Sequence, residues 1–291
     1  MNSLAILLAL AAAISWALTQ TIAKIGLKRM DLVPYLFIRP LLALLFIVPY
    51  GLLTSGFYLP SPGLIGIAIL GGLTDSFAGT MLYMFAIRKS SAHKAASLAN
   101  TAPFWGVVAA VLFLGERAQL TTFIAGGSVA LGAYFLVTRR GTTSTSYSFW
   151  EPLPALGTGI LWGLAETVPA KYCLTHGMTP ITFQLILVCT AAVSWGSVAI
   201  LRRKKHHLHF PWPGVRVALF TSFTGFFLGW ILWLSGLNLA LACQLAPVRG
   251  GAMTLFAFIF SMLLLHERPS AYSIIGMLLT VAGVSLISIM G

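Results

Sequence analysis

The chain has 291 residues, of which 58% are hydrophobic and only 8% are charged, and its mean hydropathy is +0.91. This composition excludes an ordinary soluble domain, which has about 25% charged residues. The formal net charge of +12 does not indicate a nucleic-acid partner, because the basic residues lie in short breaks between apolar segments.

Apolar runs follow one another along the whole chain, and each is long enough to cross a hydrocarbon core of about 30 Å as a helix. The predicted spans are 4–27, 33–53, 63–87, 93–114, 119–138, 152–173, 179–201, 215–237, 242–265 and 270–290. The runs are too long for the strands of a membrane barrel. The first lacks the features of a cleaved signal peptide, so we expect it to be retained. We predict an all-α integral membrane protein with ten transmembrane helices in contact with membrane lipid.

The basic residues alternate in abundance from break to break. The breaks after the odd-numbered spans contain Lys28, Arg29, Arg88, Lys89, Lys94, Arg139, Arg140, Arg202, Arg203, Lys204, Lys205 and Arg268. The opposite breaks contain only Arg117 and, at a helix edge, Lys171. Because basic loops face the cytoplasm, we expect a multi-pass protein of the cell membrane with both termini extracytoplasmic.

The two halves of the chain resemble each other. The aligned pairs are Trp16 with Trp162, Gln20 with Glu166, Pro34 with Pro180, Phe37 with Phe183, and Glu116 with Glu267. We therefore predict two five-helix repeats, residues 1–140 and 152–291, joined by a cytoplasmic linker, 141–151. An odd number of helices inverts the second repeat relative to the first, which predicts a pseudo-two-fold axis in the membrane plane.

Each half also has a Trp early in its first span, a Pro at the start of its second, and Gly-Glu-Arg or His-Glu-Arg after its fourth. The most specific stretch is APFWGVVAAVLFLGER, residues 102–117. These features resemble the EamA family of the drug/metabolite transporter superfamily. The resemblance implies a ten-helix secondary transporter of small organic solutes, with a central cavity and with packing or dimer contacts through the last helix of each half. We expect a monomer or a weak homodimer.

One departure from the repeat concerns the fourth and ninth spans. Pro103 aligns with Thr254, whereas the second half has Pro247 closer to the start of its span. We therefore do not expect these two helices to be equivalent.

Two carboxylates fall at mid-membrane depth: Glu166, within LWGLAETVPAKY, and Asp75 in the third span. A charged side chain at the bilayer centre costs about 2.5–3.5 kcal/mol, so such residues face a cavity or a partner. We expect both acids to bind solute and to couple transport to protons, because a desolvated carboxyl group can exchange a proton. The structural alternatives are neutralisation by Lys24 or Arg39, or a protonated acid that is hydrogen-bonded to hydroxyl groups.

Aromatic residues surround these acids along the helices and could form a cage for an amine. Arg249 favours a carboxylate or phosphate instead, so a zwitterion such as an amino acid or its derivative satisfies both observations. The full set of predicted solute-binding residues is Trp16, Gln20, Asp75, Tyr83, Asn100, Trp105, Trp162, Glu166, Trp230 and Arg249.

We predict a carrier of a small amphipathic metabolite that works by alternating access, with proton-coupled export preferred and uptake left open. A carrier of organic cations is the alternative. The sequence contains no nucleotide-binding motif, and we expect no cofactor. Cys173, Cys189 and Cys243 are expected to be packing residues without metal-ligand spacing, and the KKHHLH segment, residues 204–209, is too basic to favour a metal ion.

An intramembrane enzyme is a remote alternative. It could use Glu166, Asp75 and His93, but no nucleophile with a positioned base accompanies these residues. We therefore expect the protein not to be an enzyme.

Overall fold

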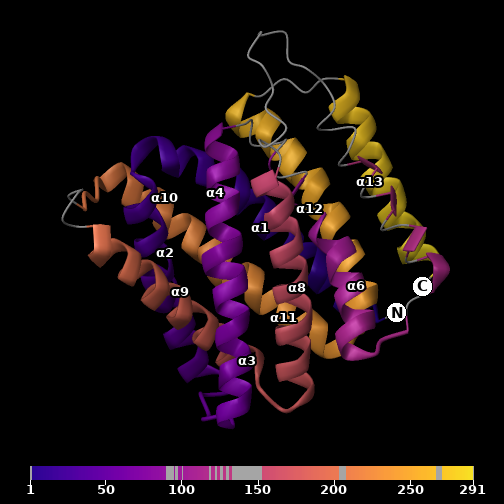
Figure 1. Cartoon of the computed structure of the whole chain (residues 1–291), viewed down its shortest axis with the longest axis horizontal. Helices are drawn as coiled ribbons and strands as arrows, with labels where there is room; N and C mark the ends of the chain where they lie inside the picture. The colour runs from indigo at the N-terminus through magenta and orange to yellow at the C-terminus, as the bar shows by residue number, and fades with distance from the viewer. Residues whose placement is uncertain are drawn as a thin grey trace.

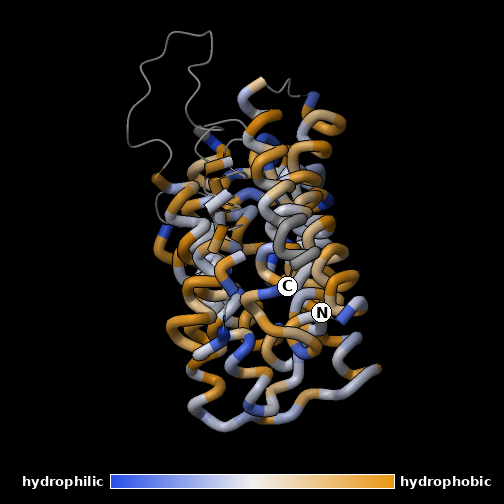
Figure 2. Tube along the Cα trace, turned by 90° about the vertical axis from the view of Figure 1, so that its right-hand side faces the viewer, coloured by the Kyte–Doolittle hydropathy of each residue, from blue (hydrophilic) through white to orange (hydrophobic). Residues whose placement is uncertain are grey.

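A computed structural model shows a bundle of long helices (Figure 1). It describes residues 2–89, 95, 98–99, 101–117, 119–121, 123–124, 127–128, 131–132, 153–202, 208–266 and 271–290. All regular structure within these residues is helical, and Figure 2 shows hydrophobic residues along the lengths of the helices. Within the described residues, six helices are long and apolar enough to cross a membrane. The chain is therefore an integral membrane protein, as predicted, whereas the number of ten spans stays a prediction.

The helices of the first half are α1 (Ser3–Arg29), α2 (Leu32–Leu53), α3 (Pro62–Gly72), α4 (Thr80–Lys89) and α6 (Ala102–Leu114). Those of the second half are α8 (Leu153–Thr175), α9 (Pro180–Arg202), α10 (Trp212–Thr221), α11 (Trp230–Leu239), α12 (Ala242–Leu265) and α13 (Ala271–Met290). A π-helical segment, η1 (Leu73–Gly79), joins α3 to α4, and a second, η2 (Ser222–Gly229), joins α10 to α11. The third and eighth predicted spans are therefore continuous helices with a π-helical middle.

The fourth predicted span differs from the structure at its start. Residues 95, 98 and 99 are helical, but Thr101 forms a turn and α6 begins at Ala102. Pro103 explains the interruption, because proline has no N–H to donate to the carbonyl of Ala99, and in a continuous helix its ring would clash with that carbonyl. Pro247, by contrast, lies inside the continuous helix α12. The expected difference between these two helices is confirmed.

Helices from the two halves pack against each other in matching pairs. The first helix, α1, packs against α12, η2 and α11 of the second half, and α8 packs against α6, η1 and α4 of the first. Figure 1 shows α4 and α8 side by side. The first helix of each half thus contacts the π-helical segment of the other half.

Small residues allow these helices to approach closely. A Cβ on Gly163 of α8 would lie 2.9 Å from the backbone nitrogen of Gly106 in α6, and one on Gly250 of α12 would lie 2.8 Å from Cβ of Pro103. On α1, Ala5, Ala9, Ala12 and Ala13 are fully buried. Helices that lack a large side chain at the contact can pack backbone against backbone, as is common in membranes.

Candidate functional site

A cavity of about 70 Å³ lies between the two halves. The residues that line it are Trp16, Thr19, Gln20, Ala23, Arg39, Asp75, Thr80, Tyr83, Met84, Trp162, Glu166, Gly225, Phe226, Trp230 and Met253. Seven of the predicted solute-binding residues are among them: Trp16, Gln20, Asp75, Tyr83, Trp162, Glu166 and Trp230. The lining comes from α1, α2, η1, α4, α8, η2, α11 and α12, and both halves therefore contribute to one wall.

Two tryptophans connect the first helix of each half to the π-helical segment of the other. Trp16 Nε1 donates a hydrogen bond to the carbonyl of Gly225 at 3.0 Å, and Trp162 Nε1 donates to the carbonyl of Asp75 at 3.2 Å. A π-helical turn shifts backbone hydrogen bonds out of the regular register, and such turns are frequent at functional sites. Each of the segments η1 and η2 therefore provides a backbone carbonyl that accepts a hydrogen bond from a tryptophan of the other half.

Glycines make room for both indoles. A Cβ on Gly79 would lie 2.7 Å from Cδ1 of Trp162, and one on Gly229 would lie 2.6 Å from Cδ1 of Trp16. No side chain fits at either place without displacing the ring. The sequence predicted both tryptophans as site residues from their alignment, but it did not predict the π-helical segments on which they pack.

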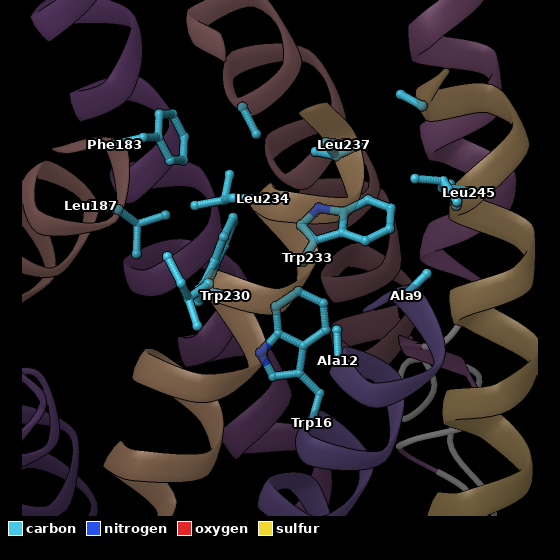
Figure 3. Packing of buried hydrophobic residues seen from close by; sticks show 14 of the residues in the cluster. Ala9, Ala12, Trp16, Phe183, Leu187, Trp230, Trp233, Leu234, Leu237 and Leu245 are labelled. Carbon is cyan, nitrogen blue, oxygen red and sulfur yellow. The ribbon is translucent and has the colours of Figure 1, made fainter. Parts of the chain in front are cut away.

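Trp16 also belongs to an aromatic cluster with α11. Figure 3 shows Trp16, Trp230 and Trp233 close together between α1 and α11. The ring of Trp16 meets that of Trp230 edge-on, with centroids 5.6 Å apart, and the centroids of Trp16 and Trp233 are 6.4 Å apart. Such edge-to-face contacts add to the stabilisation from burial and fix the orientation of the rings.

The carboxylate of Glu166 is paired with the guanidinium of Arg249. Both side chains are almost completely buried, and Trp233 Nε1 donates a hydrogen bond to the backbone carbonyl of Glu166 at 3.0 Å. The partner of Glu166 is therefore Arg249, rather than Lys24 or Arg39 as the structural alternative supposed. Glu166 lines the cavity, whereas Arg249 is not among the lining residues and its charge is neutralised by Glu166.

Asp75 has a different environment. Its Oδ2 accepts a hydrogen bond from Ser76 Oγ at 2.6 Å, and the side chain is 6% exposed and lines the cavity. No lysine, arginine or histidine in the described part of the chain forms an ion pair with it. Asp75 is thus the cavity carboxylate that remains available to a ligand or a proton.

From the sequence, Arg39 on α2 is expected at most to neutralise Asp75 or Glu166. The structure places its side chain in the wall of the cavity, with 5% exposure. Its guanidinium lies over the rings of Tyr35 and Phe226, 5.4 and 5.1 Å from their centroids. The signal that could have identified it is a lone arginine inside the apolar run 33–53, which the cost of an intramembrane charge makes a candidate by default.

The other predicted residues fall elsewhere. Trp105 is half-buried on α6, and its ring meets that of Phe104 edge-on. It is not among the residues that line the cavity. Asn100, His93, the 141–151 linker and most of the basic loop residues lie outside the described residues. Cys173 and Cys243 are buried, as expected of packing residues, whereas Cys189 is exposed on α9 and the packing prediction is wrong there.

The Gly-Glu-Arg motif connects the end of α6 to the start of α12. Gly115 ends α6 in the left-handed conformation, with φ of 67°. Glu116 then accepts hydrogen bonds from the backbone N–H groups of Ala242, at 3.2 Å, and Cys243, at 2.8 Å, at the start of α12. These N–H groups have no partner within their own helix. A first-half carboxylate therefore caps a second-half helix.

Comparisons with known proteins extend these observations. The model of the EamA-like transporter family matches residues 3–138 and 150–289. A protein of Archaeoglobus fulgidus described as an uncharacterized transporter is 25% identical over 295 residues, which cover 98% of each chain. A crystal structure superposes with a TM-score of 0.74 at 16% identity, covering 100% of this chain and 98% of that one, which shows a shared fold.

Proposed function

Because the chain belongs to the EamA-like transporter family, we propose that this membrane transporter is a secondary carrier of a small amphipathic organic metabolite. The preferred solute is an amino acid or a derivative, carried by alternating access of the central cavity between two inverted halves. The family and the relative described as a transporter point to transport rather than to enzyme chemistry.

The observation that carries the proposal is the position of Asp75 in a cavity shared by both halves. Its carboxylate has no ion-pair partner among the described residues, and the rings of Trp16, Trp162 and Trp230 line the same space. A carboxylate can bind an ammonium group, and aromatic faces attract cations and apolar chains. The site therefore supports binding of a solute that has both an amine and an apolar part.

Proton coupling follows from the same carboxylate. Asp75 can hold either a proton or the ammonium group of the solute, but not both. Exchange of one for the other on opposite sides of the membrane gives antiport, and export driven by the proton gradient is the preferred direction. Glu166 can take part only where its ion pair with Arg249 opens. Uptake remains the alternative direction.

A carrier of organic cations is the second candidate function. The aromatic wall and Asp75 favour it, because together they form the kind of cage that binds quaternary and primary amines. Arg39 in the same wall opposes it, because this buried cation would repel a ligand with only positive charge.

Counterflow in proteoliposomes tests whether the protein is a carrier. Vesicles that contain the purified protein are loaded with an unlabelled candidate solute and diluted into the labelled one. A carrier accumulates label transiently above its equilibrium level, because the internal solute returns the binding site to the outside. Equilibration without this overshoot indicates a channel, and chemical conversion of the solute indicates an enzyme.

A further inference from the structure

Arg39 is a buried cation whose hydrogen bonds are largely unmade. A guanidinium has five N–H donors, yet the structure gives it one acceptor, the carbonyl of Thr221, 3.4 Å from Nη2. Its Nε is buried without a hydrogen-bond partner, and no carboxylate in the described part of the chain pairs with it. Burial of an uncompensated charge is costly, so the remaining donors need an acceptor from the cavity.

The packing around Arg39 holds its guanidinium in place. The rings of Tyr35 and Phe226 lie against it, and Ser222 Oγ donates to the backbone carbonyl of Arg39 at 2.8 Å. Gly225 lies so close that a Cβ there would be 3.3 Å from Nη2. The side chain is therefore held between α2 and η2, in the wall of the cavity.

We propose that Arg39 binds the carboxylate of the transported solute while Asp75 binds its ammonium group. This deepens the proposed function and rests on it. Both residues line the same cavity, and they come from different helices, α2 and η1. Arg249 cannot take the role predicted for it from the sequence while Glu166 neutralises it. The planar fork of an arginine matches the two oxygens of a carboxylate.

The charges of the wall favour a carboxylate over a phosphate. Among the described residues that line the cavity, Arg39 is the only cation, and Asp75 and Glu166 line it too. A phosphate dianion would meet one positive charge and the repulsion of Asp75. A zwitterion places opposite charges against both residues, and its apolar part then meets the tryptophans. The selectivity is therefore for solutes that carry both charges.

A ligand panel on the purified full-length protein tests this selectivity. Each common L-amino acid with an uncharged side chain is compared with its amide, which lacks the carboxylate, and with the acid that lacks the amine. Inorganic phosphate completes the panel. Tryptophan fluorescence and the thermal midpoint report binding, because Trp16, Trp162 and Trp230 line the cavity. At least one amino acid should bind at least tenfold more tightly than its amide, a difference of about 1.4 kcal/mol.

Variants assign that preference to Arg39. Arg39→Gln should remove it, so that the amino acid and its amide bind equally. Arg39→Lys should preserve part of it, because the charge remains and the fork is lost. Arg216→Gln is the matched control, since Arg216 is exposed on α10, and it should keep the full preference. If Arg39→Gln does not fold, the lysine variant and the panel on the natural sequence decide the question.

Three results would overturn the inference: binding of amides as tight as that of amino acids, binding of phosphate but of no amino acid, or a full preference in Arg39→Gln. None of them refutes the carrier itself. Counterflow of amines without a preference for zwitterions would support the proposed function and reject the role of Arg39. Absence of counterflow for every solute that binds would reject the carrier.

Discussion

Arg249 is paired with Glu166, and its guanidinium lies over the rings of Trp16 and Trp233, 5.1 and 4.7 Å from their centroids. The pair joins α8 to α12, and Trp16 brings in α1. Helices of both halves therefore meet at one buried charge pair. Cation–π contacts of this kind are stronger when the cation is desolvated.

Removal of one partner of this pair should destabilise the protein. Arg249→Met leaves the carboxylate of Glu166 buried without a counter-charge, which costs about 3–5 kcal/mol of unfolding free energy. Denaturation in detergent measures the change. The double variant Arg249→Met with Glu166→Gln should recover most of the stability, because neither group is then charged. A single variant as stable as the natural protein would show that the pair contributes nothing.

The glycines under the indoles give a second prediction. Gly79→Ala and Gly229→Ala should each displace a tryptophan, because the added methyl group meets its ring, and overpacking costs about 1–3 kcal/mol. Gly66→Ala is the matched control, since a Cβ there meets nothing within 4 Å. It should stabilise α3 by about 0.5–1 kcal/mol.

Thermal midpoints in detergent compare the three variants, and tryptophan fluorescence reports whether the rings have moved. Equal midpoints for Gly66→Ala and Gly229→Ala would contradict the close approach of Trp16 to η2.

The cap at α12 gives a third prediction. Glu116→Ala removes the acceptor for two backbone N–H groups of α12, and loss of such a cap costs about 0.5–2 kcal/mol. Glu116→Gln should cost less, because the amide oxygen still accepts one hydrogen bond. Arg117→Gln, at the exposed neighbouring position, should leave the unfolding free energy unchanged. Chemical denaturation ranks the three variants, and an order with Arg117→Gln as the least stable would refute the cap.

The orientation in the membrane gives a fourth prediction. In a background without the three native cysteines, a cysteine at His207 should resist a membrane-impermeant thiol reagent on intact cells, because the basic loop is predicted to be cytoplasmic. A cysteine at Ser55, exposed between α2 and α3, should be labelled. The reverse pattern would invert the predicted topology and place both termini inside.

Much of the architecture follows from simple sequence patterns. The length of the apolar runs predicted an integral membrane protein. The bounds of α1, α2 and α12 agree with the predicted spans to within a few residues. The alignment of Trp16 with Trp162 and of Gln20 with Glu166 placed four residues that line one cavity. Repeats reveal such positions because the same helix in each half faces the shared interior.

The remaining details depend on contacts between segments that are distant in the sequence. The π-helical segments η1 and η2 have no distinct local pattern, and their carbonyls are bonded by tryptophans of the other half. The pairing of Glu166 with Arg249 joins residues that are 83 positions apart. Arg249 is neutralised by Glu166, whereas no carboxylate among the described residues neutralises Arg39. This difference depends on how each helix is rotated about its axis, which one sequence does not predict.

The measurement that tests the central claim most directly is proton movement during net solute transport into or out of proteoliposomes, with the natural protein and with Asp75→Asn. The claim is that a cavity carboxylate carries protons one way and solute the other. A pH-sensitive dye inside the vesicles should report proton flux when a solute gradient is imposed on the natural protein. Asp75→Asn should still perform counterflow, with weaker apparent affinity, because the amide oxygen can accept from an ammonium group. It should move no protons, since the amide does not titrate. Undiminished proton flux in Asp75→Asn, with counterflow intact, would contradict the account.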